Sequence, residues 1–137
     1  TADGWIVSAP AALAAAPTPL VIEAAYGDLR ATKTVWLGGA SSDNPALPAI
    51  TIAGAAAPPA GTEIVIAPLV DVPLATPLSD RDFDVNWLTS CGTMHDFDLP
   101  AGFVHVEPDD PHAGELALVV RDASGGVTWR IWPLRAE

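Results

Sequence analysis

The clearest pattern of hydrophobic positions lies near the C-terminus, where apolar runs at residues 116–120 and 127–132 flank a short turn. Both runs are rich in β-branched and aromatic residues, and the turn contains the sequence Ala-Ser-Gly-Gly. Two such runs around a glycine-containing turn are typical of a β-hairpin. The same pattern occurs over residues 20–36, so the sequence predicts a second hairpin there.

The two predicted hairpins align without a gap, so that Trp36 matches Trp132. A glycine, an aromatic residue and a proline precede each hairpin at equal spacing, in residues 4–10 and 102–108. We therefore expect residues 1–37 to correspond to the last three strands of a sandwich domain. Such a fragment has an apolar face and open edges that must be covered. Three alternatives could cover them: the second domain, sequence outside this chain, or a strand from a neighbouring chain.

Phe83, Val85 and Trp87 alternate with Asp82, Asp84 and Asn86, which predicts a half-buried strand over residues 83–89. Further short strands are expected at residues 5–8, 49–53, 62–69 and 103–106. Residues 70–79 are expected to be irregular, because Pro73 and Pro77 interrupt them. Many short strands separated by turn residues are typical of a β-sandwich.

Residues 38–48 have the glycine, serine and proline content of a linker. This divides the chain into an N-terminal strand-rich segment, residues 1–37, and a domain of residues 49–137. The sequence thus predicts an all-β protein, a β-sandwich with an additional N-terminal strand-rich segment.

The formal net charge is -11, with only six lysines and arginines, so a nucleic-acid-binding surface is not expected. The acidic surface favours solubility or, alternatively, affinity for cations or basic partners. The single cysteine cannot form an internal disulfide, and no apolar run is long enough to span a membrane. Because the chain begins at Thr1 without a signal peptide, we interpret it as a mature or trimmed product.

Two segments resemble PKD-type immunoglobulin-like domains. Val85-Asn86-Trp87, followed by Gly92, is similar to the central-strand tryptophan and subsequent glycine of that family, and residues 116–125 are similar to its closing hairpin. The resemblance implies an Ig-like (PKD-like) β-sandwich. It also implies a bacterial protein that is extracellular, at the cell surface or in the periplasm, and such proteins are often lipid-anchored. The implied role is that of a spacer, adhesin or interaction domain and not of an enzyme.

A first candidate metal site consists of Cys91, Met94 and His95, which lie within five residues. Thiolate, thioether and imidazole are ligands that suit copper, whereas the spacing matches no zinc pattern. The alternative interpretation is a partly buried cysteine with incidental neighbours.

A second candidate metal site consists of Asp80, Asp82 and Asp84, which alternate with Arg81 and Phe83. On a strand, this alternation places the three carboxylates on one face, and oxygen ligands suit calcium. The alternative is a solvated strand face whose charges prevent edge pairing.

Catalysis is not expected. Cys91, His95 and Asp96 have the residue types of a nucleophilic triad but lie too close in sequence to form one easily, and no phosphate-binding loop is present.

The tryptophans offer a binding surface instead. Trp87 is expected in the core, and Trp129 is expected to point inward, whereas Trp36 and Trp132 are predicted to be exposed and able to bind a partner chain or a glycan. We therefore expect a non-catalytic structural or interaction module that associates with a protein partner or with itself. Strand addition and the burial of aromatic side chains would provide the affinity. Metal handling and carbohydrate binding are the alternative functions.

Overall fold

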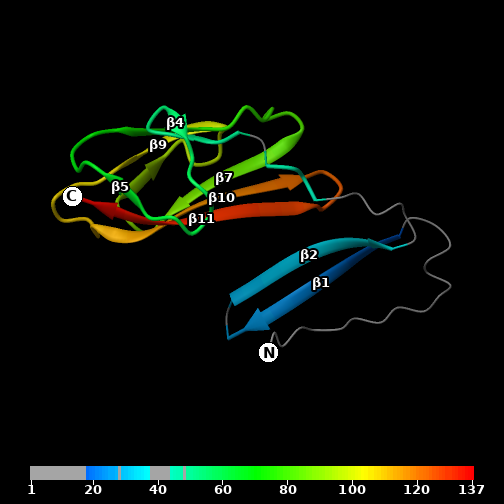
Figure 1. Ribbon diagram of the computed structural model, residues 1–137. Coiled ribbons are helices and arrows are strands. Elements are labelled where there is room, and N and C mark those ends of the chain that lie inside the picture. The colour runs from blue at the N-terminus through cyan, green and yellow to red at the C-terminus, as the bar shows by residue number, and fades with distance from the viewer. Residues whose placement is uncertain (1–17, 28, 38–43, 48) are drawn as a thin grey trace. The chain divides into compact units, whose positions relative to one another are not determined.

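The computed structural model describes residues 18–27, 29–37, 44–47 and 49–137, and within these ranges it contains strands and no helix (Figure 1). The chain divides into two compact units, Thr1–Asp43 and Asn44–Glu137. The division falls inside the segment predicted as a linker. The strand predicted at residues 5–8 lies outside the described residues.

The described part of the first unit is a β-hairpin. Strand β1 (Thr18–Tyr26) pairs antiparallel with β2 (Leu29–Leu37), which confirms the hairpin predicted over residues 20–36. Leu20 and Val35 lie opposite each other on a partly buried face, whereas Trp36 is on the other face and is 48% exposed. The predicted exposure of Trp36 is confirmed.

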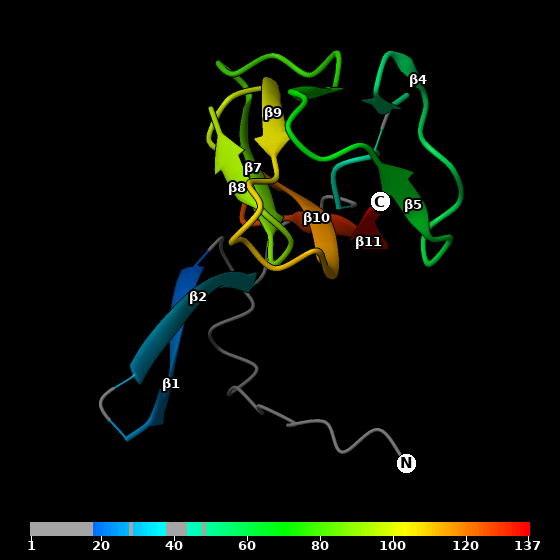
Figure 2. The ribbon, with the colours of Figure 1, turned by 90° about the vertical axis from the view of Figure 1, so that its left-hand side faces the viewer.

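The second unit consists of two sheets. The four-stranded sheet has the order β5 (Ile64–Ile66), β11 (Val127–Ala136), β10 (Ala113–Asp122) and β7 (Phe83–Thr89). The five-stranded sheet has the order β4 (Ala55–Ala56), β3 (Thr51–Ile52), β6 (Val72–Ala75), β9 (Ala101–His105) and β8 (Thr93–His95). Neighbouring strands are antiparallel except β5 and β11, which are parallel (Figure 2).

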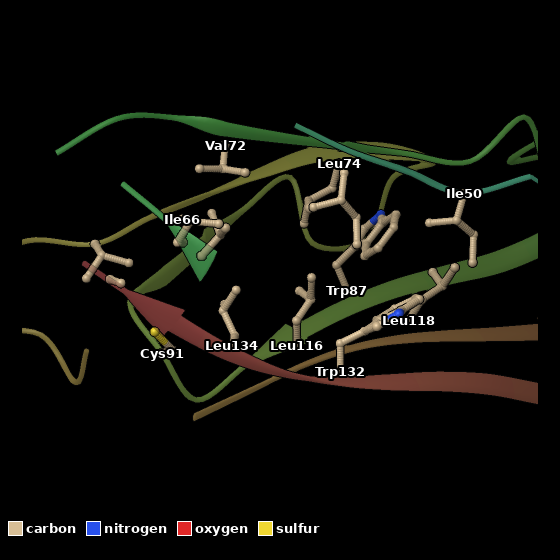
Figure 3. Packing of buried hydrophobic residues seen from close by; sticks show 14 of the residues in the cluster. Ile50, Ile66, Val72, Leu74, Trp87, Cys91, Leu116, Leu118, Trp132 and Leu134 are labelled. Carbon is tan, nitrogen blue, oxygen red and sulfur yellow. The ribbon is translucent and has the colours of Figure 1, made fainter. Parts of the chain in front are cut away.

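One hydrophobic core lies between these two sheets, so the unit is a β-sandwich. Figure 3 shows Leu74 of the five-stranded sheet pointing toward Leu116 and Leu134 of the four-stranded sheet. Leu116, Leu118 and Val120 of β10 are fully buried and alternate with less buried residues, as expected for a strand with one face on the core. Trp87 of β7 is fully buried, which confirms the prediction that it belongs to the core.

The gapless alignment of the two hairpins does not extend to their strand pairing. Leu116 pairs with Trp132, whereas the aligned residue Leu20 pairs with Val35 and not with Trp36. The turn between β1 and β2 is shorter than the turn between β10 and β11, and loop length sets the register of a hairpin. A shift of one residue changes which side chains share a face.

The prediction that residues 70–79 are irregular is wrong for β6, which lies between β3 and β9. The Pro73 carbonyl accepts a hydrogen bond from the Ala53 N–H, 2.8 Å away, so the backbone polar side of Pro73 faces the end of β3. Because β3 ends at Ile52, no strand residue there requires the N–H that proline lacks.

The predicted orientation of β11 is also wrong. Trp132 is fully buried and its Nε1–H donates a 2.9 Å hydrogen bond to the Pro58 carbonyl, whereas Trp129 is 61% exposed. Trp132, Leu134 and Ala136 form the buried side of the strand. Trp129 and Ile131 lie on the opposite side because successive residues of a strand alternate between faces.

Candidate interaction surface on the four-stranded sheet

The residues predicted to bind copper are not brought together. The Cys91 side chain is buried in the core after β7, and burial raises the pKa of its thiol, which makes a thiolate ligand unfavourable. Met94 and His95 are successive residues of β8 and point to opposite faces. Met94 packs against the core, whereas His95 is exposed and stacks on Phe103 with ring centroids 4.5 Å apart.

The three aspartates predicted to bind calcium do not share a strand. Strand β7 begins at Phe83, so Asp84 lies on it while Asp80 and Asp82 lie in the preceding turn. The predicted common strand face is therefore wrong. Across the described residues, no group of three or more histidine, cysteine, aspartate and glutamate side chains is arranged to hold a metal ion.

An apolar surface covers the outer face of the four-stranded sheet, on the side away from the core. Strand register places Leu88, Ala117 and Ile131 in one row across β7, β10 and β11, and places Val119 beside Trp129 in the next row. We call these five residues the outer-face patch. Leu88 is 53% exposed, Trp129 is 61% exposed and Ile131 is 40% exposed, so the largest side chains of the patch face solvent.

The outer-face patch is unusual for its position. The solvent-facing side of an antiparallel sheet ordinarily carries polar residues that alternate with the buried apolar ones. Here β10 and β11 are apolar on both faces around Val119 and Ile131. Contiguous exposed apolar surface on a soluble protein is characteristic of a site of interaction.

Charged residues of both signs surround the outer-face patch. Arg121 lies opposite Asp84 at one end, and its Nη1 donates a 2.6 Å hydrogen bond to Asn86 Oδ1. Glu115 and Arg135 lie toward the other end of the same face, and Arg135 pairs with Glu63 at 3.1 Å. Arg135 also pairs with Glu137 at 2.7 Å, so the rim of the patch carries both signs of charge.

Basic residues are concentrated on this sheet. Of the four basic residues in residues 44–137, Arg121, Arg130 and Arg135 lie on β10 or β11. Most acidic residues of the unit lie instead in loops. A partner that approaches the outer-face patch therefore meets little of the net negative charge.

Sequence reasoning missed this surface because it assigned Trp129 and Ile131 to the core. A detectable signal was present: residues 127–134 contain apolar side chains at both odd and even positions. Such a pattern indicates a strand whose two faces are both apolar. Trp132, predicted to bind a partner, is instead part of the core.

Comparison of the chain with protein-family models, with curated proteins and with solved structures finds no match. No helix among the described residues is long and apolar enough to cross a membrane.

Proposed function

We propose that this chain is a non-catalytic interaction module that binds a protein partner through the outer-face patch. The observation that carries the proposal is the exposure of Leu88, Trp129 and Ile131 on one face of one sheet, on the two strands β7 and β11 that flank β10. Large apolar and aromatic side chains at the centre of a surface, with a polar rim, provide most of the affinity in protein interfaces.

The strand order supports an immunoglobulin-like topology for residues 44–137. In such domains the first, second, fifth and fourth strands form one sheet, and the third, sixth and seventh form the other. Apart from the short strands β4 and β5, the chain has this order: β3, β6, β9 and β8 in one sheet, and β7, β10 and β11 in the other. Trp87 on β7 occupies the place of the core tryptophan on the third strand.

The PKD-type resemblance adds a cellular setting to the proposal. The resemblance implies a spacer, adhesin or interaction domain outside the cytoplasm, so we propose that the protein acts at the bacterial cell surface, in the periplasm or in the extracellular space. The acidic loops are suited to this role because they keep the remaining surface soluble.

Carbohydrate binding is the second candidate function, because an exposed tryptophan ring can stack on a sugar. The neighbours of Trp129 favour a protein partner instead. Val119 lies directly opposite Trp129, and Ile131 follows it on the same face, so the nearest neighbours of the ring are aliphatic, while the nearby Arg121 and Asn86 are hydrogen-bonded to each other.

The proposal is tested with a photoreactive phenylalanine analogue placed at Trp129 in the full chain, in cells that produce the protein. We expect irradiation to give covalent protein adducts. A matched chain carries the analogue at Asp109, which is exposed in the loop between β9 and β10, and should give none. Equal adduct formation at both positions, or none at either, contradicts a protein-binding role for this surface.

The carbohydrate alternative is tested by titrating the full chain with a panel of glycans while tryptophan fluorescence is recorded. A saturable change that is lost in Trp129→Ala would assign the surface to glycan binding. A flat response across the panel would exclude this alternative for the glycans tested.

A further inference from the structure

We propose that the partner bound by the outer-face patch is a second copy of this chain, related to the first by a twofold axis. The inference rests on the proposed function and adds the identity of the partner. It comes from the sequence of outward residues along β10, which are Arg121, Val119, Ala117 and Glu115. A positive charge, two apolar residues and a negative charge follow each other along one strand.

This order is complementary to itself. Consider a twofold axis that lies in the interface, runs across the strands and passes between Val119 and Ala117. The axis places Arg121 of each copy opposite Glu115 of the other, and Val119 opposite Ala117. An interface between identical copies requires this kind of pattern, in which a surface matches its own rotated image.

The apolar part of the surface is consistent with the same axis. Trp129 and Ile131 lie on β11 in the rows of Val119 and Ala117, so the rotation places Trp129 of each copy opposite Ile131 of the other. The central contacts from β10 and β11 are then between aromatic and aliphatic side chains, whereas Leu88 of each copy lies opposite Asn86 of the other. Sheets that pack face to face bury alternating side chains in this manner, with the strands inclined to each other by about 30°.

Charge is compatible with association between copies through this face. The chain carries a net charge of -11, so two copies repel each other when their acidic loops approach. The rim of the outer-face patch includes Arg121 and Arg135 beside the acidic residues Asp84, Glu115, Glu63 and Glu137. The twofold arrangement therefore places Arg121 of each copy beside an acidic residue of the other and keeps the acidic loops apart.

The test uses charge reversal in the full chain, with the mass in solution measured by sedimentation equilibrium over a range of concentrations. The wild-type chain should form dimers as its concentration rises. Glu115→Arg and Arg121→Glu each place like charges opposite each other, so each should weaken dimerisation by about tenfold or more. Asp109→Arg, which makes the same change of charge in an exposed loop outside the sheet, should retain the wild-type association.

Mixing the two single variants gives the decisive measurement. In a mixed dimer, the two arginines of Glu115→Arg face the two glutamates of Arg121→Glu, so an equimolar mixture should associate more strongly than either variant alone. Arg121→Glu loses the hydrogen bond between Arg121 and Asn86 both alone and in the mixture. Because the mixture is compared with each single variant and not with wild type, this loss does not affect the result. Urea unfolding of each variant confirms that the fold is retained.

Two results would overturn the inference. A wild-type chain that stays monomeric at every concentration excludes the second copy, and so does association that neither single reversal weakens. Photochemical adducts from position 129 with a different protein would then retain the proposed function while rejecting self-association. Adducts whose mass equals twice that of the chain support both.

Discussion

At the scale of single residues, Gly92 connects the turn after β7 to two other segments. Its φ angle is +74°, and its N–H donates a 3.1 Å hydrogen bond to the Pro111 carbonyl. A Cβ at this position would collide with the His105 carbonyl oxygen and the Val106 side chain. Glycine is therefore required both by backbone conformation and by space.

We predict that Gly92→Ala lowers the free energy of unfolding by about 3 kcal/mol or more, the combined cost of a left-handed alanine and of overpacking. Gly61→Ala is the matched control, because Gly61 has a φ of +80° but open space around its Cβ position. The control should lose about 1 to 2 kcal/mol, from backbone strain alone. Urea unfolding measures both variants, and equal losses would show that the collision at Gly92 is relieved at no cost.

The second residue-scale prediction concerns the buried thiol of Cys91. Burial raises its pKa, the negative charge of Asp110 raises it further, and a hydrogen bond with the Ala136 backbone partly opposes both. As the pH rises, the unfolded chain therefore loses this proton before the folded chain does, and the free energy of unfolding falls. Below the ordinary titration range of a thiol, both states keep the proton and the contribution is constant.

We predict that the stability difference between wild type and Cys91→Ala decreases from neutral pH to about pH 10, where an exposed thiol is ionised. Urea unfolding of both chains at each pH measures this difference, in which the other titrating groups cancel. A thiol-specific reagent should also react slowly with the folded chain and rapidly with the unfolded chain. A difference that stays constant with pH would contradict the raised pKa.

At the scale of elements, the strands that the sequence predicted well are those in which one apolar phase predominates. Phe83, Val85 and Trp87 alternate with Asp84 and Asn86, only Leu88 and Thr89 depart from the alternation, and β7 has the predicted bounds. The two hairpins were recognisable because their turns contain glycine between β-branched runs. In each case the local pattern alone determines the element.

Strand β11 shows where local pattern is insufficient. Val127, Trp129 and Ile131 form one apolar series and Trp132, Leu134 and Ala136 form another, so the sequence does not decide which face is buried. Pairing with Leu116 and the hydrogen bond to Pro58 place Trp132 in the core. Because these contacts come from segments distant in the sequence, the pattern indicates a strand with two apolar faces but does not show which of them is buried.

Strand β6 was missed for a related reason. A proline inside an apolar segment indicates irregular structure when the neighbouring strands are unknown. The position of Pro73 beside the end of β3 makes its missing N–H harmless, and only the sheet order reveals this. The calcium-site prediction is wrong because it treats all three alternating aspartates as strand residues. Asp80 and Asp82 precede β7, and only Asp84 lies on it.

At the scale of the whole molecule, the boundary of the second unit depends on a few contacts before the first core strand. The side-chain oxygen of Asn44 accepts a 3.1 Å hydrogen bond from the Val127 N–H, at the start of β11. Pro45 is buried, and Leu47 packs against the core. Part of the segment predicted as a linker therefore belongs to the sandwich.

This gives a prediction for two shortened chains. Residues 44–137 alone should unfold cooperatively, because every buried residue of the core cluster lies within this range. Residues 49–137, which begin at the end of the predicted linker, lack Asn44, Pro45 and Leu47. They should be less stable by about 2 kcal/mol, from the lost apolar burial and one hydrogen bond. Urea unfolding of the two chains measures the difference.

An Asn44→Ala change in the 44–137 chain isolates the hydrogen bond and should account for about 1 kcal/mol of the loss. If the two shortened chains are equally stable, residues 44–47 are a linker and the sandwich begins after them.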